Sequence, residues 1–200
     1  GGTGRFIHEI RFQDDFKNKI STKWFRVPFR NYFKTFNAGD TVELFGCKVS
    51  AERQTNCEVA KADKTRPFSE VEKLAAWLTK PEPASPNTSL YEGLANIFDW
   101  FRNRGTPVPE TKILTDGTEN SPETANFYQL FAAGKLGEKD FNDRHKEVFK
   151  RRQLPDLSGV SIILVGPPKG QGTERQRIEQ SLAFGASTLQ KANAQVTVRY

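Results

Sequence analysis

The chain has 200 residues, of which 36% are hydrophobic and 27% are charged. This apolar content is enough for one core, so the composition excludes a disordered chain and a scaffold that depends on disulfides. No apolar run approaches the ~18 residues that span a bilayer, which predicts a soluble protein, and the net charge of +6 favours a polyanionic partner only weakly.

The sequence contains no internal repeat and no clear domain boundary, so we predict a single domain over residues 1–200. The glycine-rich start at residues 1–4 resembles a trimmed end rather than a signal peptide. The compartment therefore stays open between the cytoplasm and export with a leader removed.

The first part of the chain predicts a strand, a helix and a second strand. Residues 5–12 are aromatic and β-branched, as is typical of a strand. Phenylalanines in residues 25–36 recur at steps of four, four and three, which is one face of a helix. Residues 41–50 predict a strand whose alternation changes phase near Gly46, as a bulge would cause.

Both cysteines fall where a hairpin is predicted. Residues 57–60 could return as a partner strand, and a hairpin centred on Glu52 would set Cys47 opposite Cys57. A cross-strand disulfide is then open to the chain, although two free thiols are the default expectation.

Two capping boxes predict helix starts, the first at Ser69 and Glu72 and the second at Ser89 and Glu92. The first opens an apolar stripe of Val71, Leu74 and Leu78, and the second opens one of Leu90, Leu94, Ile97 and Phe101. The three prolines of residues 80–86 predict a loop between them.

The second half of the chain alternates strand and helix patterns. Strands are predicted at residues 111–115, 161–165 and 195–199, a helix at residues 174–192, and a polar, partly helical region at residues 122–153. We therefore predict an α/β fold with a mostly parallel central sheet and helices on both faces, in the Rossmann-like class.

Ligands of such sheets bind outside the carboxyl ends of the strands. Three segments qualify, namely residues 13–19, 81–89 and 116–122. The third follows a buried strand with an acidic, glycine-bent sequence that begins at Asp116. A carboxylate at a rigid strand end can serve a hard cation.

Four motifs, in order along residues 37–200, resemble the von Willebrand factor A family of integrin-type metal-binding domains. The motifs are Asn37-Ala-Gly-Asp40 before a strand, Thr88-Ser-Leu-Tyr-Glu-Gly-Leu94, Ile113-Leu-Thr-Asp-Gly-Thr-Glu-Asn-Ser-Pro122, and Leu154-Pro-Asp-Leu-Ser-Gly before the strand that ends at Gly166. The third is closest to a bacterial subgroup of that family.

The resemblance implies an interaction module in which Mg²⁺ is held by three loops and a partner carboxylate completes its coordination. It carries the threonine ligand to Thr88 and the aspartate ligand to Asp116, with Glu119, Asn120 and Ser121 as partner-binding residues. The family's first loop, Asp-x-Ser-x-Ser, is missing. Its expected place holds Asp14 and Asp15 without the serines and beside lysines, so the site is degenerate and Mg²⁺ binding is an open expectation.

A nucleic-acid or other polyanion-binding domain is the alternative function. It would use Arg26, Arg30 and Lys34 on the helix of residues 23–36, together with Lys150, Arg151 and Arg152 in the run of residues 146–152. We do not expect an enzyme, because the sequence offers no complete catalytic constellation and only two histidines.

Overall fold

The computed structural model describes ten segments of the chain: residues 4–12, 41–49, 55–63, 65–66, 68–80, 88–105, 110–122, 124–148, 153–167 and 172–200. The predicted helix at residues 25–36 and most of the predicted proline loop lie outside the described residues.

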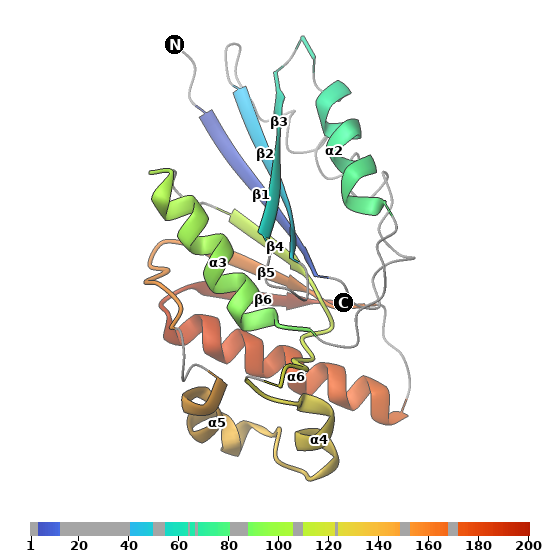
Figure 1. Ribbon diagram of the computed structural model, residues 1–200, viewed down its shortest axis with the longest axis vertical. Helices are drawn as coiled ribbons and strands as arrows, with labels where there is room; N and C mark the ends of the chain where they lie inside the picture. Colours follow the sequence, from blue (N-terminus) through green and yellow to red (C-terminus); the bar gives the residue numbers. More distant parts are fainter. Residues whose placement is uncertain are drawn as a thin grey trace.

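A six-stranded sheet forms the centre of the molecule (Figure 1). In spatial order its strands are β3 (Thr55–Ala62), β2 (Thr41–Val49), β1 (Gly4–Phe12), β4 (Glu110–Leu114), β5 (Ser161–Val165) and β6 (Gln195–Arg199). Every neighbouring pair is parallel except β2 and β3. The predicted mostly parallel sheet is confirmed.

Helices cover both faces of this sheet. They are α2 (Ser69–Thr79), α3 (Leu90–Asn103), α4 (Phe127–Ala132), the 3₁₀ helix η2 (Glu138–Asp140), α5 (Phe141–Val148) and α6 (Gly172–Lys191). Leu44 packs in a core cluster with α2, whereas the next residue, Phe45, packs in a cluster with α3 and α6. Successive strand residues point to opposite faces, so α2 lies on one face and α3 and α6 on the other. Figure 1 shows α4 and α5 packed against the outer side of α6.

The predicted bulge in β2 is wrong. The register of β2 runs without interruption against both β1 and β3. Residues 44–47 are buried in succession because both faces of this strand are covered, which removes the alternation that a half-buried strand shows. On the α2 face, a Cβ at Gly46 would lie 2.9 Å from side-chain carbons of Leu74 and Leu78, so the glycine allows α2 to pack closely.

The predicted hairpin is confirmed and its cysteines are joined. β3 pairs antiparallel with β2 and sets Cys47 opposite Cys57, and the two form a disulfide rather than the default pair of free thiols. Cys47 shares a strand face with Phe45, so the disulfide borders the α3 side of the core.

Neither predicted capping box forms, although both helices and their apolar stripes are confirmed. Ser69 is already helical, and the N-cap position belongs to Phe68, whose side chain makes no cap hydrogen bond. The carboxylate of Glu70 instead accepts a hydrogen bond from the backbone N–H of Lys61 at 2.8 Å, which ties α2 to β3.

Among the described residues, no helix is both long and apolar enough to cross a membrane.

Candidate functional site

The strand order places a topological switch point between β1 and β4. The chain continues from β1 to β2 on one side of the sheet and from β4 to β5 on the other, so the connections diverge between β1 and β4. Parallel sheets bind ligands at such a point, outside the carboxyl ends of the strands. Asp116 follows the end of β4 by two residues and therefore lies at this carboxyl edge of the sheet.

The carboxylate of Asp116 is buried and faces a cation from α6. Its side chain is 4% exposed, Oδ1 accepts a hydrogen bond from the backbone N–H of Thr118 at 2.8 Å, and Oδ2 lies 3.8 Å from Nη2 of Arg177. The guanidinium of Arg177 thus supplies positive charge at the carboxylate that the resemblance would give to a metal.

Arg177 also connects Asp116 to an exposed aromatic side chain. Its Nε donates a hydrogen bond to Oγ1 of Thr118 at 3.4 Å, and its guanidinium carbon lies 4.6 Å from the ring centroid of Tyr128. Tyr128 is 45% exposed. Sequence reasoning missed both Arg177 and Tyr128, because they lie far along the chain from Asp116 and belong to no motif.

Gly117 allows the loop after β4 to lie directly against α6. Its φ of 75° falls in the left-handed region, and a Cβ there would lie 3.0 Å from the backbone N of Leu182 and from the backbone C of Ser181. Only glycine meets both conditions without strain. The close approach brings the first turns of α6, and Arg177 with them, to Asp116.

The two sequence motifs around Thr88 and Asn120 meet in space. The backbone N–H of Thr88 donates to the carbonyl of Asn120 at 2.8 Å, and the N–H of Asn120 donates back at 2.9 Å. These reciprocal bonds join the start of α3 to the loop after β4, so Thr88, from the second predicted segment, lies beside the third.

Glu119 lies inside the protein rather than on the predicted partner-binding surface. It is 0% exposed, and its Oε2 accepts hydrogen bonds from the backbone N–H groups of Leu90 at 2.7 Å and Tyr91 at 3.4 Å. The hydroxyl of Thr124 donates to Oε1. Glu119 therefore caps α3 from a distant loop, whereas Ser89 makes no side-chain cap.

Burial raises the pKa of Glu119 to about 7, against the opposing effect of its hydrogen bonds from Thr124, Leu90 and Tyr91. The nearby charge of Glu92 raises it further. The same environment raises the pKa of Tyr91, chiefly through burial and in second place through Glu119. This buried carboxyl is thus partly protonated near neutral pH.

The other predicted site residues divide into two groups. Ser121 is buried, while Thr88 and Asn120 are partly exposed where the start of α3 meets the loop after β4. The remaining predicted residues lie outside the described segments: Asp14, Asp15, Arg26, Arg30, Lys34, Lys150, Arg151 and Arg152.

The expected Mg²⁺ site stays a prediction, because Asp14 and Asp15 of its first loop lie outside the described segments. Within those segments no group of three or more His, Cys, Asp or Glu side chains could hold a metal. Mg²⁺ demands near-octahedral oxygen coordination, whereas Asp116 already faces a guanidinium and Thr88 would add one hydroxyl. What the arrangement does offer is a hydrogen-bonded loop at the carboxyl edge of the sheet, close to an Arg–Tyr pair that is partly exposed.

A scan of protein-family models finds no match to this chain, and a search of curated proteins finds no significant match.

Proposed function

We propose that the chain is a protein-interaction module of the von Willebrand A type that binds its partner at the carboxyl edge of the sheet, around Asp116, without a metal of its own. The observation that carries this proposal is the cluster of Asp116, Arg177 and Tyr128 beyond the carboxyl end of β4.

Topology supports the fold assignment. The strand order β3-β2-β1-β4-β5-β6 is the order of doubly wound, Rossmann-like folds, here with an antiparallel edge strand. The motifs that resemble the von Willebrand A family fall at the start of α3 and directly after β4, where such a fold presents ligand-binding loops.

The rigidity of the loop after β4 supports a binding role. Three contacts fix this loop. They are the reciprocal hydrogen bonds between Thr88 and Asn120, the hydrogen bond from the start of α3 to Glu119, and the close packing of Gly117 against α6. A surface that is ordered before binding loses less conformational freedom when a partner arrives.

The chemistry of the Arg–Tyr pair supports a protein partner. Tyrosine and arginine are enriched among the residues that dominate binding energy in protein interfaces. Tyr128 offers an exposed ring, and Arg177 is held against it by a cation–π contact while Asp116 compensates its charge. A partner that covers Tyr128 would exclude water from both side chains and strengthen this contact.

The test uses peptides selected from a phage-displayed library on the wild-type protein in the presence of a chelator. Their affinities are then measured for Tyr128→Ala, Arg177→Gln and the control Arg104→Gln. Arg104 is a matched control because it also lies over an aromatic ring, 4.4 Å from that of Trp100, at the far end of α3.

We expect the selected peptides to bind Tyr128→Ala and Arg177→Gln at least about tenfold more weakly than wild type, since a dominant interface residue contributes about 2 kcal/mol or more. Binding to Arg104→Gln should stay within about twofold. Peptides that bind all three variants as tightly as wild type would locate the binding surface elsewhere and overturn the proposal.

A further inference from the structure

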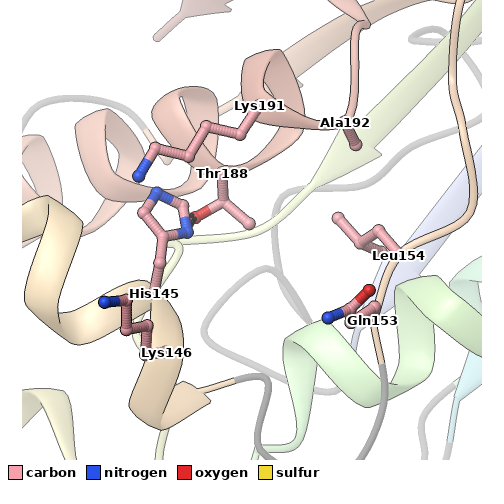
Figure 2. Close-up of a pocket in the computed structure, with 7 residues that line it drawn as sticks. All are labelled: His145, Lys146, Gln153, Leu154, Thr188, Lys191 and Ala192. Carbon is pink, nitrogen blue, oxygen red and sulfur yellow. Dashed lines mark hydrogen bonds between the residues drawn. The ribbon is translucent and has the colours of Figure 1, made fainter.

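A separate cavity of about 400 Å³ lies at the opposite end of α6 from Arg177 (Figure 2). It opens between the last turn of α6, helix α5 and the segment that leads to β5. Its volume falls in the range of small-molecule sites, ~300–1,000 Å³. None of the described residues that line the cavity belongs to the cluster of Asp116, Arg177 and Tyr128, so a ligand bound here is independent of the proposed function.

One wall of the cavity is a buried histidine in a fixed orientation. His145 is 8% exposed, although the sequence places it in a charged run that is typical of a solvated surface. Oγ1 of Thr188 lies 3.1 Å from Nδ1 of the ring, and the ring stacks on Phe184 with centroids 5.1 Å apart. Figure 2 shows the imidazole pointing at Thr188 and Lys191 on α6.

The charge of the lining is positive. Lys146 and Lys191 both border the cavity, and none of the lining residues within the described segments is acidic. Burial, and in second place the charge of Lys191, lower the pKa of His145 to about 4, so the imidazole is neutral at pH 7. The cavity therefore presents two ammonium groups together with an uncharged ring and the hydroxyl of Thr188.

The opposite wall is mainly apolar. Leu154 and Ala192 border the cavity across from His145, and Gln153 adds an amide (Figure 2). A ligand that fits both walls carries a negative group at one end and an apolar body at the other. Lysine ammonium groups bind carboxylate and phosphate as point charges, with the hydroxyl as an added hydrogen-bond partner.

We propose that this cavity binds a small organic anion, whose carboxylate or phosphate group lies between Lys191, Lys146 and Thr188 and whose apolar body packs on Leu154 and Ala192.

The test follows the histidine ring resonances by NMR while benzoate, phenyl phosphate or the neutral benzamide is titrated into the full chain. The chain contains only His8 and His145, so His8→Gln assigns both resonances. We expect benzoate, phenyl phosphate or both to shift the His145 resonance at millimolar concentration, and benzamide to leave it in place. Which anion binds more tightly distinguishes carboxylate from phosphate.

The bound anion should also raise the pKa of His145 from about 4 towards its ordinary value, because it offsets the charge of Lys191 that faces the ring. Lys146, on the same helix as His145, is the other charged side chain among the described residues that line the cavity, and its charge would be offset as well. A ligand bound elsewhere on the surface would leave this pKa unchanged.

Two substitutions that each remove one positive charge complete the test. Lys191→Gln should weaken anion binding about tenfold or more, since it removes one charged contact. Lys73→Gln removes an exposed lysine on α2, outside the cavity, and should change the affinity by less than about twofold. The proposal is overturned if neither anion shifts His145, if benzamide acts as benzoate does, or if Lys191→Gln binds as tightly as wild type.

Discussion

Glu119 links the candidate site to the stability of the fold. Its carboxyl group is fully buried, yet three hydrogen bonds from Leu90, Tyr91 and Thr124 satisfy it. One side chain therefore orders the start of α3 and the loop after β4 together. A buried acid of this kind stabilises the folded protein more when it is protonated, because burial removes the hydration of the charged form.

The raised pKa of Glu119 predicts a specific pH dependence of stability. The folded protein keeps this proton up to about pH 7, whereas the unfolded chain releases it near pH 4.5. The contribution is therefore complete below pH 4.5 and is lost as the pH rises through 7. We expect the free energy of unfolding of wild type to fall by about 2 to 3 kcal/mol over this range, relative to Glu119→Gln.

Urea denaturation of both proteins across this pH range measures the difference. His145 titrates in overlapping conditions but does so in both proteins, so its effect cancels in the comparison. Glu138→Gln, which removes an exposed carboxylate on η2, should follow the wild-type curve. Parallel curves for wild type and Glu119→Gln would show that the Glu119 pKa is not raised in the folded protein.

At the scale of elements, the contact between the loop after β4 and α6 decides whether the site exists. Gly117 stands where both its own φ and the backbone of α6 exclude a side chain. The loop therefore cannot approach Arg177 unless residue 117 is glycine. This contact joins segments that are about sixty residues apart in the sequence.

We expect Gly117→Ala to lower the free energy of unfolding by about 2 to 4 kcal/mol, as the sum of left-handed strain and overpacking against backbone. Gly134→Ala is the matched control. Gly134 has a similar φ of 67°, but nothing lies within 4 Å of its missing Cβ, so only the strain of about 1 kcal/mol should appear. Equal losses in the two variants, measured by chemical denaturation, would mean that the loop does not pack against α6 as described.

The sequence predicted most elements because their signals are local. Apolar stripes identified α2 and α3, and strand composition identified β1, β2, β4, β5 and β6 within one or two residues. The caps were predicted wrongly because a capping box assumes a partner three residues away, whereas the carboxylate that caps α3 is Glu119. The bulge was predicted wrongly because alternation cannot show that Gly46 lies on a strand covered on both faces.

At the scale of the whole molecule, strand order determines which residues can act together. Residue type and position after a strand were enough to identify Asp116 and its place at the carboxyl edge. Arg177 and Tyr128 could not be identified in this way, because the packing of α6 against the loop after β4 brings Arg177 to Asp116, and the packing of α4 against α6 brings Tyr128 to Arg177. The cavity at His145 lies at the other end of α6 from Arg177, so the two proposed ligands would bind at separate surfaces.

Our central proposal is that Arg177 balances the charge of Asp116 where a partner binds, so that no bound metal is needed there. Calorimetric titration of Mg²⁺ and Mn²⁺ into the chelator-treated protein tests this directly, with Asp116→Asn as the matched variant because it keeps the shape of the side chain. We predict no saturable binding that distinguishes wild type from Asp116→Asn at millimolar ion concentration. Saturable binding in wild type that Asp116→Asn abolishes would contradict the proposal that no metal is needed, and would establish a working metal site at Asp116.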